Sequence, residues 1–310
     1  MTIVVAGGTG LAGSAIVRAY QATGAEVIAV NRKVVDLLDR DATTAFLKKT
    51  KPSLVVDAAA KVGGIGANNA FPVEFLSDNV RIQSNLMEAA HTADVEKFIF
   101  LGSSCIYPRD CAQPIKEEYL LTGPLEETNS AYAVAKIAGI ELIKSFRKEY
   151  GRKWISLMPT NLYGINDNFE LQGSHVLPAF IRRFVEAAEN NVPVETLWGT
   201  GSPKREFLHV DDLAAAVVHL GDHYDSSEHI NIGTGEDLTI KELAELVAEL
   251  SGFKGELAWD SSKPDGTPRK VLDVSKAKAL GWAPKISLRD GIASTIAWYK
   301  DATAKGEVRR

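Results

Sequence analysis

Short apolar runs alternate along the first half of the chain with longer segments in which apolar residues recur every three or four positions. The runs occupy residues 2–6, 26–30, 54–58, 97–101 and 154–158. Runs of about five residues are typical of buried strands, and the periodic segments between them are typical of helices. Strands that alternate with helices imply a doubly wound parallel sheet, so the pattern predicts an α/β fold.

The second half of the chain is richer in loops, notably at 164–174 and 260–269. Apolar runs at 194–198 and 229–232 indicate that the chain leaves the sheet and returns to it. The helices expected here lie near 213–219, where Asp211 and Asp212 are placed to cap the helix, near 239–251 and near 287–301.

This organisation predicts two lobes. We expect a nucleotide-binding domain of residues 1–163 with returning segments near 194–232. A smaller, partly discontinuous C-terminal substrate lobe would comprise residues 164–193 and 233–310, and the site would lie in the cleft between the lobes.

Composition narrows the classes of partner. A formal net charge of -5 over 310 residues argues against binding to nucleic acid or to a membrane surface, since neither polyanion would attract the whole molecule. No apolar run approaches the ~20 residues that span a bilayer, and no basic leader precedes the first strand, so we expect a cytoplasmic protein. Cys105 and Cys111 are too few for a disulfide framework and are expected to be thiols. The histidines show no metal-ligand spacing, so no metal is expected.

A glycine-rich turn follows the first strand and precedes a helix that should run to about Thr23. Glycines in this position allow a tight turn and let backbone N–H groups approach a pyrophosphate, as in a Rossmann-type sheet. The residues of this expected dinucleotide turn are Gly7, Gly8, Thr9, Gly10, Leu11, Ala12 and Gly13.

The second strand ends in Asn31-Arg32-Lys33 and lacks the acid that would accept hydrogen bonds from a free adenosine ribose. Two cations there suit a 2′-phosphate, which favours NADP(H) over NAD(H). The alternative is that Arg32 and Lys33 form an ordinary solvated turn.

Ser103, Tyr132 and Lys136 form a candidate set for ketone reduction. A phenol has a pKa of about 10, so Tyr132 needs a nearby cation to act near neutrality, and Lys136 lies four residues later on the same helix face. The Ser103 hydroxyl would hold the substrate oxygen. The alternative reading of Tyr132 and Lys136 is a solvated pair on a helix surface.

The glycine turn, the Ser-Ser-x-x-Tyr segment and Tyr-x-x-x-Lys occur in the order and spacing of a known family. Together they resemble the extended short-chain dehydrogenase/reductase family of nucleotide-sugar enzymes over nearly the whole chain. The more specific stretches are AKVGGI at 60–65, LGSSCIYP at 101–108, MPTNLYG at 158–164, REFLHVDD at 205–212 and KPDGTPRK at 263–270.

The resemblance implies NADPH-dependent 3,5-epimerisation and 4-reduction of a GDP-linked 4-keto-6-deoxysugar, GDP-4-keto-6-deoxy-D-mannose, by a homodimer. It makes Ser103, Tyr132 and Lys136 the reduction triad, Cys105 the base and His175 the acid of epimerisation. It assigns the cofactor site, besides the glycine turn, Tyr132 and Lys136, to Leu101, Gly102, Ser103, Ser104, Pro159, Thr160, Asn161, Leu162 and His175. It assigns substrate contacts to Arg183, Trp198, Arg205, Asp265 and Lys270.

The sequence leaves several alternatives open. Cys105 would equally suit a small buried apolar position, which is the commoner fate of a free cysteine. Family members often carry a basic residue where this chain has Thr9, so the choice of NADP(H) depends more heavily on Arg32 and Lys33. A related GDP-sugar reductase or epimerase of the colitose type would use the same residues. A protein that senses NADP(H) without catalysis would need only the glycine turn.

Overall fold

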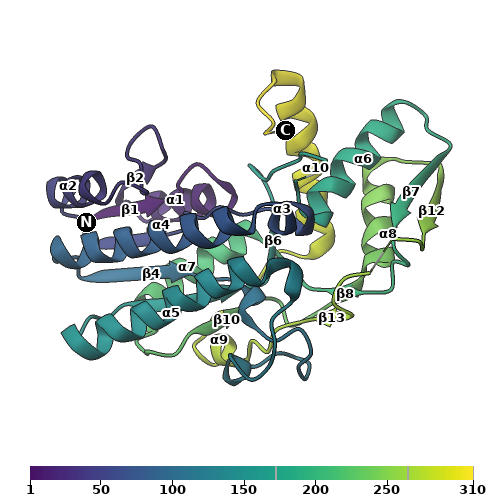
Figure 1. The fold of residues 1–310 in the computed structure, drawn as a ribbon. Helices are drawn as coiled ribbons and strands as arrows, with labels where there is room; N and C mark the ends of the chain where they lie inside the picture. Colours follow the sequence, from purple (N-terminus) through teal and green to yellow (C-terminus); the bar gives the residue numbers. More distant parts are fainter. Residues whose placement is uncertain (172, 264, 310) are drawn as a thin grey trace.

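The computed structural model describes residues 1–171, 173–263 and 265–309, and its centre is a six-stranded parallel sheet (Figure 1). Across the sheet, the order is β10 (Ile230–Ile232), β5 (Ile155–Pro159), β4 (Lys97–Leu101), β3 (Leu54–Asp57), β1 (Thr2–Ala6) and β2 (Glu26–Val30). The α/β fold with a parallel, doubly wound sheet is therefore confirmed, and the five runs expected in the first half of the chain all form strands of this sheet.

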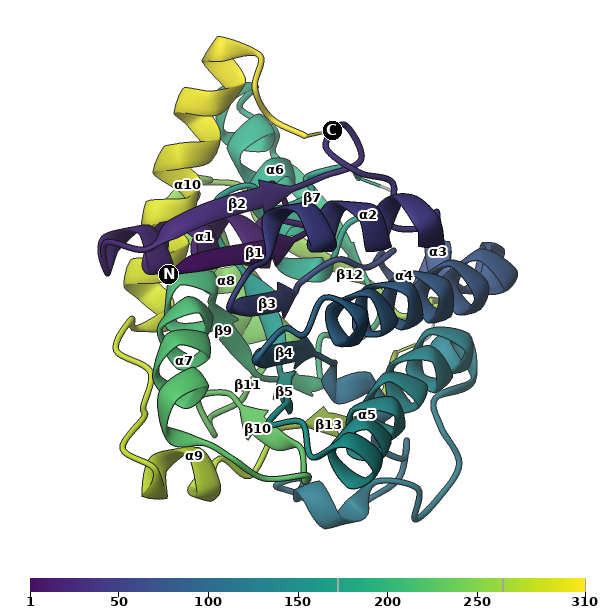
Figure 2. The ribbon, with the colours of Figure 1, turned by 90° about the vertical axis from the view of Figure 1, so that its left-hand side faces the viewer.

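Helices cover both faces of the sheet, which is why the strands are apolar throughout rather than alternating. One face carries α1 (Leu11–Ala22) and α7 (Val210–His223), and the other carries α2 (Arg40–Thr50), α4 (Pro72–Thr92) and α5 (Ser130–Tyr150), as Figure 2 shows. The side chains of consecutive strand residues point to opposite faces of the sheet. Val4 packs in the core beneath α2, α4 and α5, whereas Val5 packs in the core beneath α1 and α7.

A second group of elements packs beside the sheet, as Figure 1 shows. It comprises α6 (Val176–Glu189), α8 (Ile240–Ser251), α10 (Leu288–Lys305), β7 (Val194–Trp198) and β12 (Glu256–Asp260). Its apolar core lies between the three helices. The short strands form three further sheets. They pair as β7 with β12, β6 (Asn161–Tyr163) with β9 (Phe207–His209), and β8 (Lys204–Arg205) with both β11 (Leu238–Thr239) and β13 (Arg269–Lys270). The short helices are α3 (Ile65–Ala70) and α9 (Ser275–Ala279) with the 3₁₀ turns η1 (Ser104–Ile106), η2 (Glu117–Tyr119) and η3 (Glu127–Asn129).

The division of the chain into two lobes stays a proposal. Of the segments expected to return to the sheet, Ile230–Ile232 pairs with β5, whereas Val194–Trp198 pairs with β12 outside the central sheet. We propose a nucleotide-binding lobe of residues 1–163 with α7, β10 and α9, beside a smaller lobe built around α6, α8 and α10. Residues 172, 264 and 310 of the expected substrate lobe lie outside the described residues. Within the described ranges, no helix is long and apolar enough to cross a membrane.

The start of α7 corrects one expectation. The helix begins at Val210 rather than at residue 213, and its N-cap is His209, whose ring Nδ1 accepts the Asp211 N–H at 3.2 Å. An imidazole nitrogen can accept this bond as a carboxylate would, so the aspartates are free for other partners. The Asp212 carboxylate instead accepts the N–H groups of Lys285 and Ile286 at 3.0 and 2.9 Å.

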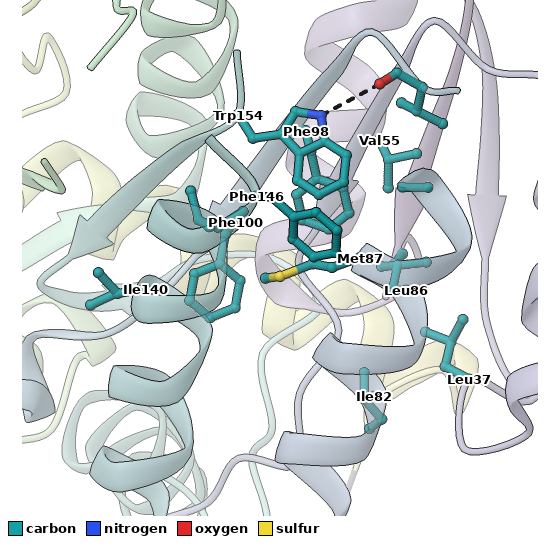
Figure 3. Close-up of a cluster of buried hydrophobic side chains, with 14 of the residues drawn as sticks. Leu37, Val55, Ile82, Leu86, Met87, Phe98, Phe100, Ile140, Phe146 and Trp154 are labelled. Carbon is teal, nitrogen blue, oxygen red and sulfur yellow. Dashed lines mark hydrogen bonds between the residues drawn. The ribbon is translucent and has the colours of Figure 1, made fainter. Parts of the chain in front are cut away.

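Aromatic packing closes the core beneath α4 and α5 (Figure 3). The Trp154 ring lies 5.1 Å from that of Phe98 and 4.8 Å from that of Phe146, between centroids. Its indole N–H donates to the Val95 carbonyl at 3.4 Å, so the polar end of this buried ring is satisfied. Leu86 and Met87 of α4 fill the same core.

We predict that Leu86→Ala lowers the free energy of unfolding by about 2–5 kcal/mol, because it leaves a cavity in a core where Leu86 is 1% exposed. Chemical denaturation gives the measurement. Arg81→Ala, at an exposed position of the same helix, is the matched control and should change stability by less than about 0.5 kcal/mol. A similar, small effect of both changes would contradict this account of the core.

Candidate functional site

Because the strands are parallel, the carboxyl ends of β1, β3, β4 and β5 meet at one edge of the sheet. The glycine turn lies there after β1. Gly7 has a φ of 72°, and a Cβ atom on it would lie 2.7 Å from the Ala58 carbonyl oxygen. The Gly10 N–H donates to the Gly7 carbonyl at 2.9 Å, and α1 begins at the next residue, Leu11.

This turn fits a pyrophosphate. Gly10 is the N-cap of α1 and makes no side-chain cap bond, so within the described ranges the first N–H groups of the helix have no side chain that caps them. A Cβ on Gly10 would meet its nearest neighbour only at 3.4 Å, so this side of the turn is open. The opposite side, at Gly7 and Gly8, is packed against β2 and the end of β3. The turn therefore supplies the two features that bind a dinucleotide pyrophosphate, a helix N-terminus and space beside it.

The end of β2 presents two cations. Asn31 Oδ1 accepts the Lys33 N–H at 2.9 Å and shapes the turn, while Arg32 and Lys33 are exposed. Among the residues that the structure describes, neither cation takes part in an ion pair. Both are therefore available to an anionic ligand. Thr9 is exposed as well and supplies no charge.

The structure brings Ser103, Tyr132 and Lys136 together at the end of β4. Lys136 is 3% exposed, and its Nζ donates to the Leu101 carbonyl at 2.8 Å. The ammonium also lies 5.9 Å from the centroid of the Tyr132 ring. A hydrogen bond with the Ser103 side chain links the Tyr132 phenol to the third member.

The electrostatics of this set differ from the expectation of an acidified phenol. Burial raises the pKa of Tyr132, as does the charge of Cys105, and the hydrogen bond with Ser103 opposes them. The phenol therefore stays protonated over a wide pH range, as a proton donor must. Burial lowers the pKa of Lys136, and the charge of Asp57 opposes that shift.

Asp57 is a residue that the sequence reasoning missed. It ends β3, is fully buried, and has a pKa raised to about 6, chiefly by burial and against the charge of Lys136. The available signal was an acid inside an apolar run, at 54–58, whose other residues are all apolar. Burying an ionised carboxylate is costly, so an acid within a buried strand indicates a specific role.

Cys105 lies on η1, two residues after Ser103. The Ser103 Oγ accepts the Cys105 N–H at 3.2 Å, which orients the turn. Two donors reach the sulfur: the Asn129 amide nitrogen at 3.5 Å and the Lys270 Nζ at 3.7 Å. Asn129 was also missed, because nothing in the spacing links it to Cys105. Both Cys105 and Cys111 are free cysteines.

His175 is the N-cap residue of α6. Its pKa is lowered, chiefly because protein atoms around the ring displace water and secondly by the charge of Lys270. The residue as a whole still has solvent-exposed surface. Lys270 thus acts on both His175 and Cys105. The two expected proton carriers of epimerisation therefore face the same cation, one from α6 and the other from η1.

Arg205 and Lys270 are neighbours by register, since β8 pairs with β13 at these positions. Burial lowers the pKa of Arg205, while the charges of Cys105, Glu126 and Asp265 raise it, so the guanidinium lies among these groups. Asp265 is held by Thr200, whose N–H and hydroxyl donate to its carboxylate at 2.9 and 2.7 Å.

Arg183 and Trp198 lie apart from this group. Arg183 forms an ion pair with Glu195 and donates to the Thr196 carbonyl at 2.6 Å. Trp198 is 74% exposed, with the Lys263 Nζ 5.7 Å from its ring centroid. No contact in the described part of the chain joins either residue to Cys105 or Arg205.

The expected cofactor walls are tied into the sheet by backbone bonds. The Gly102 N–H donates to Leu157, and the Thr160 N–H donates to Ile232, both at 2.9 Å. The Asn161 amide donates to the Glu206 carbonyl at 2.8 Å. Leu101, Ser104 and Thr160 are buried, so these walls are rigid parts of the core edge. In the described ranges, no cluster of three His, Cys, Asp or Glu residues could hold a metal ion.

Comparison with known proteins agrees with this geometry. A model of the NAD dependent epimerase/dehydratase family matches residues 3–233. The chain belongs to this family. GDP-L-fucose synthase 1 of Arabidopsis thaliana is 54% identical over 298 residues, which cover 96% of this chain and 92% of that protein. GDP-L-fucose synthase of Escherichia coli (strain K12) is 50% identical over 307 residues, which cover 96% of each chain.

A solved structure extends the likeness within the family. A GDP-mannoheptose C4 reductase from Campylobacter jejuni with NADP bound superposes with a TM-score of 0.89 and 37% identity, covering 96% of this chain and 98% of that chain. NAD and NADP share the pyrophosphate that suits the glycine turn. The end of β2 is therefore the feature of this chain on which the choice between the two cofactors depends.

We predict that Arg32→Ala raises the KM for NADPH about tenfold while changing the KM for NADH by less than twofold, because a charged hydrogen bond to the 2′-phosphate contributes about 1.5 kcal/mol. Steady-state kinetics with each cofactor provide the measurement. NADH is the internal control, since it lacks the phosphate. A wild-type preference for NADH, or equal losses with both cofactors, would contradict the assignment.

Proposed function

We propose that this protein has the activity of a GDP-L-fucose synthase. It would convert GDP-4-keto-6-deoxy-D-mannose to GDP-L-fucose by epimerisation at C3 and C5 and NADPH-dependent reduction at C4. The observation that carries the proposal is the single site in which Ser103, Tyr132 and Lys136 adjoin Cys105, whose sulfur lies 3.7 Å from Lys270 Nζ. The two GDP-L-fucose synthases that are 50 and 54% identical support it.

Epimerisation needs a base and an acid beside the ketone. The C4 carbonyl acidifies the protons on C3 and C5. At each of these carbons, Cys105 would remove the proton and His175 would return one to the opposite face, and proton exchange with solvent would restore the thiolate and the imidazolium before the second inversion. The Lys270 ammonium and the Asn129 amide stabilise negative charge on the sulfur. The lowered pKa of His175 makes its protonated form a stronger acid, at the cost of a smaller protonated fraction near neutrality.

Reduction uses the neighbouring set. NADPH, when bound, supplies the hydride for C4. Ser103 would hold the ketone oxygen, and Tyr132, which burial keeps protonated, would donate the proton to that oxygen. The buried Lys136 ammonium stabilises the phenolate that remains. The cofactor would be held by the glycine turn of α1, by Arg32 and Lys33, and by the edge formed by β4 and β5.

The nucleotide part of the substrate needs cations and an aromatic surface. Arg205 and Lys270, adjacent on β8 and β13, are suited to the diphosphate. Asp265 would accept hydrogen bonds from the nucleotide, and Trp198 would offer an exposed ring for stacking. Arg183 would contribute only by rearranging its pairing with Glu195.

We also propose that the protein is a cytoplasmic homodimer. The support for the dimer is a set of exposed apolar side chains on the two adjacent helices α4 and α5, namely Val73, Leu76 and Val134. Two copies could cover these side chains by pairing the same helices about a two-fold axis. A chain of this kind would draw on the NADPH and GDP-sugars of the cytoplasm.

The second candidate is a GDP-sugar C4 reductase that does not epimerise. It is favoured by the superposition with the GDP-mannoheptose C4 reductase. The two candidates differ in whether the protein exchanges carbon-bound protons of the substrate with solvent. A colitose-type enzyme acting on a 3-deoxy ketosugar would invert C5 alone and would be recognised by deuterium uptake at that carbon.

We predict that the two half-reactions separate in single variants. Tyr132→Phe should keep the exchange of solvent deuterium into C3 and C5 of the ketosugar while losing NADPH oxidation about 10²- to 10⁴-fold, because it lacks the acid for the C4 oxygen. Cys105→Ser should lose the exchange and retain reduction of the unepimerised ketone. Mass spectrometry of the sugar nucleotide recovered from D₂O measures the first activity, and absorbance of NADPH measures the second.

The outcomes are decisive for each candidate. Exchange at neither carbon in the wild type, with NADPH oxidation present, would favour the reductase. Full exchange in Cys105→Ser would remove this thiol from the mechanism. A wild type that binds NADPH and never oxidises it with any GDP- or dTDP-linked 4-ketosugar would leave only a cofactor-sensing role.

We predict that Arg205→Ala weakens GDP binding about 10- to 100-fold in calorimetry, because a charged hydrogen bond to the diphosphate is lost, while the affinity for NADPH changes less than twofold. Arg40→Ala, which removes a 70% exposed cation from α2, is the matched control and should alter neither affinity. Unchanged GDP affinity in Arg205→Ala would place the sugar nucleotide elsewhere.

A further inference from the structure

Asp57 is a buried acid that neither proposed half-reaction uses. It is the last residue of β3 and is 0% exposed. One carboxylate oxygen, Oδ1, accepts the Ala59 N–H at 3.1 Å, and the other, Oδ2, has no hydrogen-bond partner among the described residues. An ionised carboxylate in this position is costly unless an opposite charge lies close to it.

The opposite charge is Lys136. Asp57 pairs in register with Phe100 of the adjacent strand β4, and the Phe100 ring centroid lies 4.8 Å from the Lys136 Nζ. Strand residues alternate between faces, so Asp57 shares the face of Val55 and Phe100, on which α5 packs and from which Lys136 comes. The ammonium has three donors, and the one hydrogen bond that it makes with the described residues goes to the Leu101 carbonyl.

The other polar groups of α4 on this face are neutral and already bonded to the backbone. The Asn79 side chain accepts the Lys61 N–H at 2.8 Å and donates to the Phe75 carbonyl at 2.7 Å. The Gln83 amide donates to the Ala135 carbonyl at 2.6 Å.

The remaining charged or titratable groups nearby act elsewhere. Lys61, in the loop after β3, forms ion pairs with Glu74 and Asp78 of α4. Cys105 of η1 acts on the Tyr132 phenol. Asp57 is therefore the negative charge that acts on Lys136, and it acts on Tyr132 as well.

We propose that Asp57 is a positioning residue for the reduction step: its carboxylate holds Lys136 as an ammonium and adds to the effect of burial that keeps Tyr132 a protonated phenol. This inference rests on the proposed function, because it assigns to Asp57 control over the proton that Tyr132 donates. Asp57 touches neither substrate nor cofactor in this role. It sets the upper limit of the pH range in which the reduction can proceed.

The sign of the effect follows from the charges. Burial lowers the pKa of Lys136, and the Asp57 carboxylate opposes that shift. Burial and the charge of Cys105 raise the pKa of Tyr132, and the Asp57 carboxylate adds to that shift. Both effects of the carboxylate keep the pair protonated to higher pH. Removing the carboxylate therefore lowers both pKa values, and the pair loses its proton at a lower pH. The alkaline decline of the reduction rate should move in the acidic direction.

Asp57→Asn is the test, because the amide keeps the shape of the carboxylate and removes its charge. The alkaline limb of NADPH oxidation should shift to lower pH by about one to two units, the usual effect of an opposite charge within ~4–6 Å. Solvent deuterium exchange into C3 and C5 should be unchanged, since Cys105 and His175 perform it. A structural role alone would reduce both activities together and leave the limb in place, and that result would overturn the proposal.

A measurement without substrate or cofactor separates this proposal from the proposed function. The pKa of Asp57 in the folded protein is raised to about 6, so the folded state binds this proton more tightly than the unfolded state does. The stability that Asp57 contributes is present below pH ~4 and is lost as the pH rises to about 6. Relative to Asp57→Asn, the wild type should thus lose stability between pH 4 and 6.

Asp41→Asn, at an exposed position of α2, is the matched control and should show no such difference from the wild type. Lys136→Met should extend this loss of stability to higher pH, because the Lys136 ammonium lowers the pKa of Asp57. An unchanged pH dependence in Lys136→Met would show that the two charges do not act on each other and would overturn the proposal, whatever the enzyme's substrate. If Asp57→Asn does not fold, the double variant with Lys136→Met should fold again, because it removes both buried charges. A double variant no more stable than the single one would also overturn the proposal.

Discussion

The parallel pairing of β1, β3, β4 and β5 is the constraint on which the site depends. Parallel strands end at the same edge of the sheet. Residues more than 90 positions apart in the chain, such as Gly7 and Ser103, therefore lie at that edge because of strand pairing and not because of contacts between their own side chains. The burial of the sheet on both faces makes that edge rigid. Each part of the site lies where a strand ends. The glycine turn follows β1, Asp57 is the last residue of β3, and the Ser103 turn follows β4.

A second constraint joins the smaller lobe to this edge. Glu206 is 0% exposed, and its carboxylate accepts the N–H groups of Thr234, Gly235 and Leu272 at 2.6, 2.8 and 2.8 Å. These bonds compensate for burial of the carboxylate, and they fasten the segment after β10 and the segment after β13 to β8. Arg205, the neighbour of Glu206, and Lys270 are thereby held beside Cys105. A single buried acid thus connects the lobe that would bind the nucleotide-sugar with the sheet that would bind the cofactor.

Burial dominates the electrostatics of the site. It keeps the Tyr132 phenol protonated and pulls the pKa values of Lys136 and His175 downward. Charged neighbours change these pKa values further: Asp57 raises that of Lys136, and Lys270 lowers that of His175. The proton donor to oxygen and the carriers of carbon-bound protons thus lie in one site, with Asp57 acting on the first set and Lys270 on the second.

The sequence by itself determined the α/β class, the strands of the central sheet and the chemistry-bearing residues of its edge. Five-residue apolar runs and glycine turns are local patterns, and Tyr132 and Lys136 share a helix face by their spacing alone. Tertiary structure decided the rest. It selected His209 as the cap of α7, placed Val194–Trp198 outside the central sheet, and brought Asn129, Asp57 and Lys270 to their partners. Those contacts join residues from 24 to 165 positions apart, as Asn129 and Lys270 are from Cys105, and no local pattern carries such a distance. They depend on how the elements pack, which is a property of the whole chain.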